Sequence, residues 1–297
     1  MTFATIKDLC SGEDDGDGQT TATFPVAAAC QALGVSRSGY YAWLTRPESD
    51  RDERRAALAQ KVIAAHEEGR GAYGSPRVYQ ALKASGETAC ENTVARVMRA
   101  QGLRGRVRRG FVPRTTDSAH THPIAKNLLD RDFTAHLPNR KWAADITCVP
   151  TDQGWLYVAG VIDLCSRKLV GWAAADHMET DLVAEALRSA IEQRRPGAGL
   201  LHHSDRGCQY ASVAYQGLLA RHGIEASMSG KGDCWDNAPM ESFWATLKGE
   251  LTDHEHYATR DEARRSIGEY IKTFYNRKRL HSSLGYKSPE TFEAGLN

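Results

Sequence analysis

Three β-rich runs between Lys141 and His177 constrain the fold of this chain most strongly. The runs are KWAADITCVPT, GWLYVAGVIDLCS and RKLVGWAAADH, and short turn segments separate them at 152–154 and 166–167. Strand-forming residues divided by such short turns are typical of antiparallel hairpins. The runs therefore predict a three-stranded antiparallel meander.

Helical and strand patterns alternate after the meander. We expect a helix over 180–195, a short buried strand at 199–205, a helix at 211–222, a strand at 224–228 and a helix from about 238 to 251. Asn237 is the expected N-cap of that last helix, with Pro239 in its first turn. Three hairpin strands followed by a crossover helix and further strands and helices are the order of an RNase H-like fold, so the fold class is α/β.

The residues before the meander predict a small all-α region. Residues 24–43 read as helix, turn at Gly34 and helix, with Ser36 as an N-cap. Further helices are expected over 51–66, 76–85 and 91–101. The last two, joined by a short turn that contains Gly86, have the outline of a helix-turn-helix, which any small helical bundle can also have.

These patterns divide the chain into five segments. The segments are a disordered acidic N-terminus over 1–23, a helical helix-turn-helix DNA-binding region over 24–105, a basic linker and connector over 106–140, an RNase H-like catalytic core over 141–260, and a C-terminal helix (261–276) with a basic tail over 261–297. The first segment is predicted to be disordered because it is acidic and has few apolar residues.

Basic and acidic residues are segregated along the chain. The formal net charge is only +1, but residues 51–114 carry +8 and residues 115–260 carry −5. The stretch LRGRVRRGFVPR contains Arg104, Arg106, Arg108 and Arg109 without any acidic residue. An extended arginine-rich segment suits phosphate contacts or entry into a minor groove, although a solvated linker can have the same composition. The basic block therefore indicates an anionic polymer as partner.

Cysteine spacing and hydropathy exclude other classes. The seven cysteines are widely spaced and form no C-x-x-C, which favours reduced thiols over a disulfide framework or a zinc site. No apolar run reaches about 18 residues, so no membrane span is expected. The first residues lack the basic start and apolar stretch of a secretory signal. We therefore expect a cytoplasmic protein.

Three acidic residues fall where this fold brings chain segments together. Asp145 lies in the first strand, Asp205 closes the fourth, and Glu241 lies in the first turns of a helix. Converging carboxylates repel one another unless cations are bound, and such hard oxygen ligands suit Mg²⁺ or Mn²⁺. Two ions about 3.5–4 Å apart stabilise the attacking and leaving oxygens of a phosphoryl transfer. Because 37 of the 297 residues are acidic, the spacing alone could arise by chance.

The sequence around these acids is more specific. The segments are WAADITCVPTDQGWLYVAGVIDLCSRKLVGW, HHSDRGCQYAS, SGKGDCWDNAPMESFWATLKGEL and YNRKRLHSSLGYKSP. Together with RGAYGSPRVYQAL, they resemble bacterial insertion-sequence transposases related to retroviral integrases, in particular the second-reading-frame product that carries the catalytic domain. Asp205 and Glu241 are separated by 35 residues, as in the D,D-35-E signature of that family, and Lys248 follows Glu241 by seven.

The resemblance implies a transposase that cleaves DNA at insertion-sequence ends by hydrolysis and then joins the 3′-OH to a target strand. Asp145, Asp205 and Glu241 would bind two Mg²⁺ or Mn²⁺ ions, and Lys248 would contact the transposon end as part of the catalytic site. Expected partners are the terminal repeats, target DNA, further copies of the chain in a homo-oligomer, and an upstream-frame product as a fusion. The expected location is the bacterial cytoplasm, on the nucleoid when DNA is bound.

Further residues are candidates for DNA contact or have plainer interpretations. Arg77, Lys231 and Trp235 are expected to contact DNA, Trp235 by stacking on bases. Core or strand packing is the expected role of Trp244 and of one of the pair His202 and His203. The remaining candidates are Asp163, expected in a strand-end turn, the loop acids Asp233 and Asp236, discounted as ligands, and Arg277–Arg279, which could bind DNA or solvate the tail.

Three functions are compatible with these features. They are a transposase, an RNase H-like nuclease or integrase with another role, and a non-catalytic DNA-binding regulator. The intact acidic triad with Lys248 disfavours the regulator. Terminal inverted repeats flanking the gene would distinguish the first from the second.

The arginine-rich segment generates a test. We expect replacement of Arg106, Arg108 and Arg109 by Ala to weaken DNA binding and flatten its salt dependence, because each lost phosphate contact lowers the slope of log K against log salt by about 0.9. DNA affinity measured across a salt series checks this. An unchanged slope would mean that the segment is only a linker.

Overall fold

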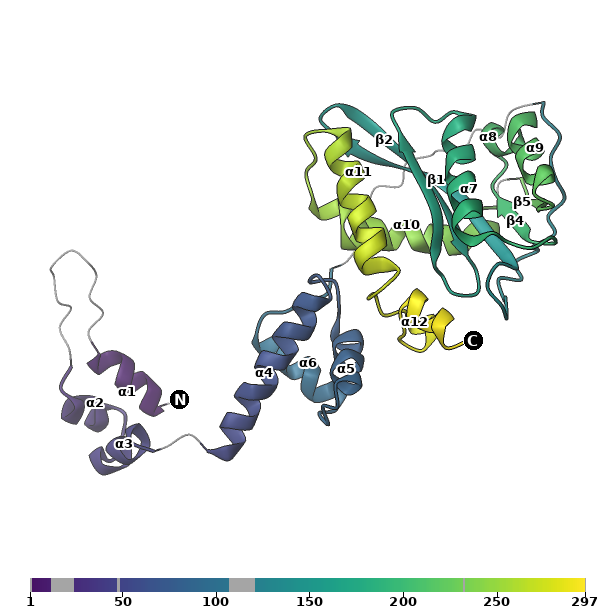
Figure 1. Cartoon of the computed structure of the whole chain (residues 1–297). Helices are drawn as coiled ribbons and strands as arrows, with labels where there is room; N and C mark the ends of the chain where they lie inside the picture. The colour runs from purple at the N-terminus through teal and green to yellow at the C-terminus, as the bar shows by residue number, and fades with distance from the viewer. Residues whose placement is uncertain (1, 12–23, 47–48, 107–120, 232, 297) are drawn as a thin grey trace. The chain divides into compact units, whose positions relative to one another are not determined.

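The computed structural model describes residues 2–11, 24–46, 49–106, 121–231 and 233–296. The chain divides into two compact units, Met1–Gln60 and Lys61–Asn297. Figure 1 labels the elements of both. The boundary falls inside α4 (Asp50–Glu68), so the predicted region 24–105 does not form one compact unit.

The first unit contains a pair of short helices joined by a turn. The pair consists of α2 (Val26–Ala32) and α3 (Arg37–Leu44). Gly34 has a φ of 66°, a left-handed conformation that glycine adopts without steric cost. Ser36 caps α3, because its Oγ accepts a hydrogen bond of 3.0 Å from the Gly39 backbone N–H. The predicted helix, turn and N-cap are confirmed.

The predicted disorder of residues 1–23 is wrong for its first part. Thr2–Cys10 form the helix α1, and its Ile6 side chain is fully buried with Cys30 and Tyr40. Phe3 also packs on Tyr40, with ring centroids 6.2 Å apart. The acidic composition of the segment gave no indication of this short helix, because the apolar residues against which it packs lie some 30 residues further along the chain. Residues 12–23 lie outside the described part.

The helices of the second unit that precede the sheet confirm the helix-turn-helix outline. They are α5 (Ser75–Ala84) and α6 (Glu91–Ala100), separated by a turn in which Gly86 has a φ of 86°. Apolar side chains of both helices are buried, namely Val78, Leu82, Val94, Val97 and Met98.

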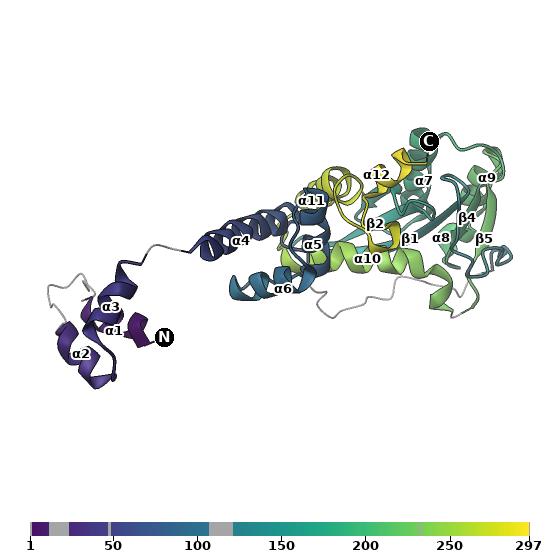
Figure 2. The same cartoon turned by 90° about the horizontal axis from the view of Figure 1, so that it is seen from below.

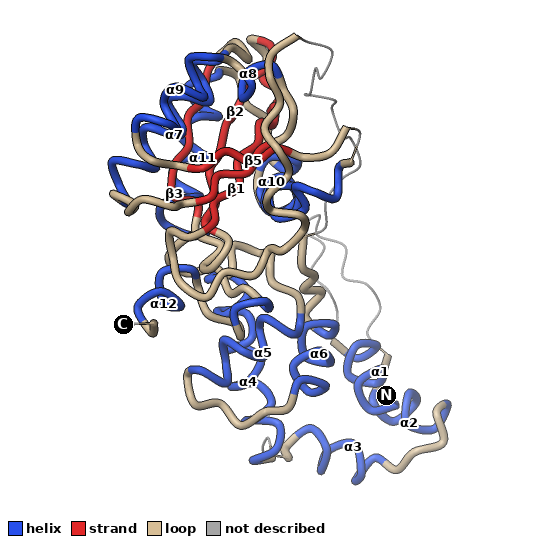
Figure 3. The backbone as a smooth tube through the Cα atoms, turned by 90° about the vertical axis from the view of Figure 1, so that its right-hand side faces the viewer, coloured by secondary structure: helices blue, strands red, loops and turns tan. Residues whose placement is uncertain are grey.

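A five-stranded mixed sheet forms the centre of the second unit (Figure 3). Its strands are β1 (Lys141–Thr151), β2 (Gly154–Asp163), β3 (Leu169–Ala175), β4 (Leu201–Ser204) and β5 (Glu225–Met228). The order is β3-β2-β1-β4-β5. The first three strands pair antiparallel, as predicted, and β4 pairs parallel with both β1 and β5. This is the strand arrangement of an RNase H-like integrase core.

Helices cover both faces of the sheet and make three layers. One face packs against α7 (Thr180–Arg194), α8 (Cys208–Ala211) and α9 (Val213–Arg221). On the other side lie α10 (Ala238–Glu250) and α11 (Arg260–Glu269), and Figure 2 shows α10 and α7 on opposite sides of the strands. Because side chains alternate along a strand, Trp142, Ala144 and Ile146 enter the α7 core while Asp145 points to the α10 side.

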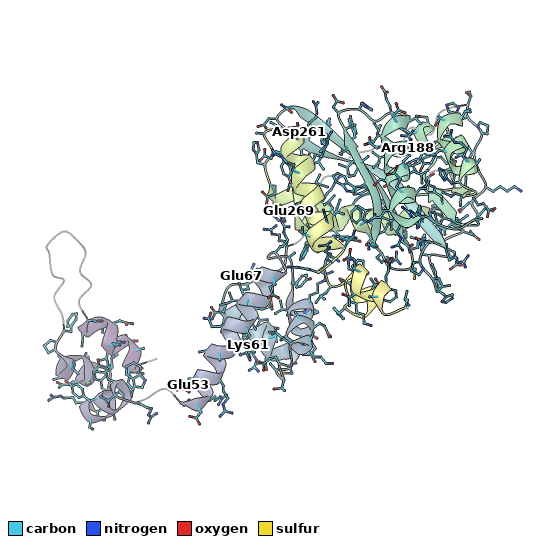
Figure 4. The ribbon with its side chains drawn as sticks, viewed as in Figure 1. Glu53, Lys61, Glu67, Arg188, Asp261 and Glu269 are labelled. Carbon is cyan, nitrogen blue, oxygen red and sulfur yellow. The ribbon has the colours of Figure 1, made fainter. Side chains whose placement is uncertain are left out.

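The helices that cover the sheet bury apolar side chains and expose charged ones. Leu182 and Leu187 of α7 are buried, whereas Arg188 lies on the outer face (Figure 4). Asp261 and Glu269 mark the two ends of α11 in the same view. Within the described residues, no helix combines the length and apolar character needed to cross a membrane.

The helix predicted over 261–276 is present, whereas the basic tail contains structure that was not predicted. After α11 the chain continues as a π-helix over Tyr270–Tyr275. The tail contains a 3₁₀ turn, Ser282–Leu284, and the helix α12 (Pro289–Ala294), which Ser288 caps by accepting from the Thr291 N–H at 3.2 Å. The Arg279 side chain in this tail is buried rather than solvated.

Close packing between β3 and α7 generates a stability prediction. A Cβ atom on Gly171 would lie 2.3 Å from the Ala186 carbonyl oxygen and 2.6 Å from the Ala190 nitrogen, and both are backbone atoms. We therefore expect Gly171→Ala to lower the free energy of unfolding by about 2–4 kcal/mol. Urea unfolding measures this change.

Gly217 is the matched control. It is exposed within α9, and a Cβ there would meet nothing within 4 Å. Gly217→Ala should raise the free energy of unfolding by up to about 1 kcal/mol, because alanine forms helices better than glycine. Equal effects of the two substitutions would contradict the packing described.

Candidate active site

Strand pairing brings Asp145 and Asp205 together. In the parallel pair of β1 and β4, Ala143 lies opposite His203. Both aspartates follow two residues later in their segments, so the same register places them side by side at the end of β4. The strand itself ends at Ser204, one residue earlier than predicted.

The two carboxylates interact electrostatically. Burial raises the pKa of Asp145 well above its ordinary value, and the negative charges of Asp205 and, more weakly, Glu241 raise it further. Asp205 is held by a hydrogen bond of 2.9 Å, in which its Oδ1 accepts from the Gly207 backbone N–H. The polypeptide thus places negative charge where only a cation or a proton relieves the repulsion.

Helix α10 brings the third carboxylate to the same edge. Asn237 is the N-cap residue of this helix and Pro239 lies in its first turn, as predicted, but the Asn237 side chain makes no capping hydrogen bond. Instead its Nδ2 donates to the Ala144 carbonyl oxygen at 3.0 Å, which ties the start of the helix to the residue before Asp145. Glu241, in the first turn, is exposed.

The donor set fits a hard divalent cation. Asp145, Asp205 and Glu241 offer only carboxylate oxygens, which suit Mg²⁺ or Mn²⁺. Across the described ranges, no three His, Cys, Asp or Glu side chains are already gathered closely enough to hold one ion together. The two aspartates are positioned by the sheet, whereas Glu241 is exposed on the helix.

Trp244 is a functional residue whose polar role was not predicted. Its indole is buried, in agreement with the predicted packing, but its Nε1 also donates to Asp145 Oδ2 at 3.1 Å. Gly160, which lies opposite Asp145 on β2, makes room for the ring, since a Cβ there would lie 3.0 Å from the indole. A glycine inside a strand often marks such a close approach, so Gly160 was the sequence signal from which this contact could have been predicted.

Lys248 lies on the same helix as Glu241 and Trp244, but its side chain is buried, at 7% exposure. Its positive charge acts on Cys148, where it partly offsets the effect of burial, which raises the pKa of that thiol. Its expected contact with DNA stays a prediction.

Both histidines before Asp205 are internal. His202 Nε2 and the Tyr215 hydroxyl are 3.1 Å apart, and His203 lies within hydrogen-bonding distance of the Ser227 and Ser229 hydroxyls, at 2.9 and 3.1 Å. Burial lowers the pKa of His202 to about 3 and that of His203 to about 4, so both are neutral at physiological pH. The packing interpretation is confirmed.

The discounted loop acids have other partners. Asp236 accepts hydrogen bonds from the Gly230 N–H, from Asn127 Nδ2 and from Arg131 Nε, at 2.7, 3.0 and 2.8 Å, and Arg131 also pairs with Asp233. These contacts hold the loop before α10 against the connector.

Asp163 stabilises the turn after β2, as predicted. It is fully buried and accepts from the backbone N–H groups of Asn139 and Cys165 and from Trp142 Nε1, at 2.6, 2.9 and 3.2 Å.

Arg77 makes internal contacts in this structure. Its Nε donates to the Leu280 carbonyl oxygen at 3.0 Å, and its guanidinium lies 3.7 Å from Glu250 Oε1. Glu250 is buried at the end of α10, where it accepts from the Arg279 guanidinium at 2.6 and 2.8 Å and from the Tyr270 hydroxyl at 2.7 Å. Arg77 therefore joins the helix-turn-helix to α10 and the tail, and a contact with DNA stays a prediction.

The other candidates for DNA contact differ in their surroundings. Arg104, Lys231 and Trp235 are exposed, Trp235 at 66%. Arg106 is exposed too, but its guanidinium donates to the Glu250 carbonyl oxygen at 2.8 Å. Arg108 and Arg109 lie outside the described residues. Replacing these last two alone would therefore separate DNA contact from the internal bond of Arg106.

Comparison with protein families matches both the sheet and the helices before it. Models described as integrase core domains match residues 135–234 and 222–289, and a model described as an HTH-like domain matches residues 53–111. Two solved structures are similar at low identity. The catalytic core domain of HTLV-2 integrase in complex with magnesium is 16% identical, with a TM-score of 0.43, over 54% of this chain and 99% of that chain. A chain of the simian T-cell lymphotropic virus intasome in complex with the PP2A regulatory subunit B56 gamma is 14% identical, with a TM-score of 0.45, over 77% and 73%.

Two bacterial proteins are much more similar in sequence. An uncharacterized 31 kDa protein of insertion element IS600 from Shigella sonnei is 44% identical, over 89% of this chain and 96% of its own length. Transposase InsF for insertion sequence IS3A from Escherichia coli K12 is 43% identical, over 92% of this chain and 95% of its own. The similarity thus extends over nearly the whole of both relatives.

The Trp244–Asp145 hydrogen bond can be tested by Trp244→Phe, which keeps an aromatic ring but removes the donor. A hydrogen bond to a charged group contributes about 1.5–3 kcal/mol, so we expect metal-dependent strand cleavage to fall about tenfold or more. Trp172→Phe is the control, because Trp172 lies opposite Gly160 on β3, where its ring packs near Gly268. Equal cleavage by the two variants would refute a positioning role for Trp244, provided that thermal melting shows both to be folded.

Proposed function

The chain belongs to the IS3 family of insertion-sequence transposases, and we propose that Asp145, Asp205 and Glu241 are the metal-binding carboxylates of its active site. It acts on DNA as a polynucleotidyl transferase, cutting at the ends of an insertion sequence and transferring the strand, with divalent metal ions as cofactor. The register of β1 with β4 carries the assignment, because it sets Asp145 beside Asp205.

The charge balance of the site supports this role. Asp145 is half-buried, and burial and the other two carboxylates all disfavour its ionised form. A protein that retains such an arrangement loses stability unless a cation compensates for it. Two Mg²⁺ or Mn²⁺ ions, when bound, would stabilise negative charge on the attacking and leaving oxygens of the phosphodiester.

Each residue of the site has a distinct part in this proposal. Asp145 and Asp205 are metal ligands held by the sheet edge, and the Trp244 indole orients Asp145 by occupying its Oδ2. Glu241 is the third ligand, which α10 supplies from its exposed first turn. Lys248, two turns further along α10, contacts the element end when DNA is bound.

The reaction proceeds in two displacements at phosphorus. Water attacks the phosphodiester at the element end, and the 3′ oxygen leaves as a free hydroxyl while the phosphate stays on the neighbouring 5′ end. That 3′-OH then attacks a phosphodiester of the target, so that one P–O bond forms, one breaks and the target's own 3′ oxygen leaves. No covalent link to the protein is needed, which agrees with an active site built only from carboxylates.

The helix-turn-helix is the proposed reader of the element end. In this motif the second helix enters the major groove. That helix is α6, and its Arg96 and Arg99 are exposed, so we add them to the predicted DNA contacts. Trp235 and Lys231, in the loop before α10, would contact DNA near the carboxylates.

Assembly follows from the reaction. Transposition requires two element ends to be handled together, so we propose that at least two copies of the chain assemble on DNA. A fusion with the product of an upstream reading frame is a further proposal, and activity assays of the chain alone and of the fusion distinguish the two forms.

Asp205→Asn tests the active site. We expect it to leave folding and DNA binding largely intact and to abolish Mg²⁺-dependent cleavage of labelled element ends, because Asn keeps the shape of Asp but lacks its charge. Asp233→Asn is the matched control, since Asp233 is an acid of the nearby loop that pairs with Arg131. The assignment fails if Asp205→Asn cleaves as well as the control, or if the control loses cleavage as completely.

A further inference from the structure

A cavity of about 330 Å³ lies behind the catalytic helix α10. Its wall on α10 is formed by Ala238, Pro239, Ser242, Phe243 and Thr246, and none of the three carboxylates lines it. Successive residues of an α-helix are turned by about 100°, so most of this wall faces away from Glu241 and Trp244. The cavity is therefore separate from the carboxylates, although both are built on the same helix.

The cavity is rich in positive charge. Arg77, Arg167 and Arg279 all line it, and Glu250 is the carboxylate that pairs with two of them. Burial by itself lowers the pKa of Arg279, but its hydrogen bonds to Glu250 raise that pKa above its ordinary value. His281, also in the lining, adds no charge, because burial and then the three arginines lower its pKa to about 3. Three guanidinium groups thus line the cavity, and Glu250 pairs with only two of them.

Arg167 is the member of this set without an ion pair among the described residues, and the negative charge of the buried Asp163 only partly offsets the effect of burial on its pKa. Among the described residues its guanidinium makes no hydrogen bond and no ion pair, and burial lowers its pKa. Arg77 and Arg279, by contrast, both contact Glu250. An anion in the cavity would offset this unfavourable burial.

The backbone of Arg167 is fixed in an uncommon conformation. Its φ is 59°, in the left-handed region that costs a residue with a Cβ about 1 kcal/mol or more. Its N–H donates to the Asp163 carbonyl oxygen at 2.8 Å, and its own carbonyl oxygen accepts from the Tyr275 hydroxyl at 3.1 Å. The turn between β2 and β3 therefore holds this arginine in place before any ligand arrives.

We propose that this cavity binds a phosphodiester group of DNA, with Arg167 as its principal ligand. Guanidinium groups match phosphate oxygens in geometry and charge. The hydroxyls of Ser242, Thr246, Ser282 and Ser283 line the same space and can donate to such a group. The volume lies near the lower limit of small-molecule pockets, so it admits a phosphate with its adjoining sugar rather than a duplex.

The position of the site has a consequence for catalysis. A phosphate held on one side of α10 would fix the helix that carries Glu241 and Trp244 on its other side. The same phosphate would contact Arg77 from α5, so DNA in the cavity would fasten the helix-turn-helix to the core. The inference rests on the proposed function only in taking DNA as the source of the phosphate.

Arg167→Asn tests the proposal, because asparagine tolerates the left-handed conformation but carries no charge. Arg195→Asn is the matched control: Arg195 is also left-handed, with a φ of 43° at the end of α7, and is exposed outside the cavity. Affinity for a nonspecific duplex is measured in EDTA across a salt series. We expect Arg167→Asn to bind about tenfold more weakly and to lower the slope of log K against log salt by about 0.9, while Arg195→Asn changes neither.

A second variant tests the proposal if Arg167→Asn does not fold. Ser283 is exposed at the rim, so Ser283→Asp should leave the fold intact and weaken DNA binding by repelling phosphate. Equal affinities and slopes for wild type and for the folded cavity variants would overturn the proposal.

A further measurement distinguishes a phosphodiester of DNA from free phosphate as the ligand of the cavity. If inorganic phosphate raises the melting temperature of wild type but not of Arg167→Asn, while their DNA affinities are equal, the cavity binds a free anion and the DNA assignment is wrong. The cleavage of element ends by wild type and by Asp205→Asn is measured in a separate assay. The assignment of the active site can therefore be correct even if the cavity proposal is wrong.

Discussion

The parallel pairing of β4 with β1 is the constraint on which the rest of the structure depends. It sets Asp145 and Asp205 side by side at the edge of a sheet, where their charges repel. Such a pair is unfavourable for stability, and the surrounding fold has to maintain it. Packing of Trp142, Ala144 and Ile146 in the α7 core and contacts with α10 hold β1. Pairing with β1 and β5 and the contacts of His202 with Tyr215 and of His203 with Ser227 hold β4, so these interactions oppose the repulsion. The unfavourable repulsion between the two carboxylates is therefore confined to a site where a cation can bind.

Helix α10 connects the parts of the second unit because each of its faces has a different partner. One face offers Glu241 and Trp244 to the aspartates, and another packs Phe243 in the core. Its last residue, Glu250, is buried between Arg279 of the tail and Arg77 of the helix-turn-helix. Removing one partner from a buried ion pair usually destabilises a protein by several kcal/mol, so this end of the helix is firmly held. The position of the catalytic helix therefore depends on segments far away in the sequence.

Local patterns predicted most elements correctly because their causes are local. Alternating apolar residues and short turns indicated the meander, and helical periodicity with turn residues indicated the helix-turn-helix. The failures had distant causes. The helix α1 forms because Ile6 packs against Tyr40, and Asn237, at the predicted N-cap position of α10, donates to the Ala144 carbonyl oxygen without making a side-chain capping bond. The change from α-helix to π-helix at Tyr270 left no signal in the pattern of apolar residues.

The sequence by itself determined the order of helices and strands, the three acidic residues and their family setting. Those features depend on residue type and on spacing within short windows. Only the tertiary structure decided that the Trp244 indole donates a hydrogen bond to Asp145 and that Arg167 lines a cavity without an ion pair among the described residues. Trp244 and Asp145 are 99 residues apart. Contacts over such distances depend on strand register and on packing between layers, and no local pattern encodes either.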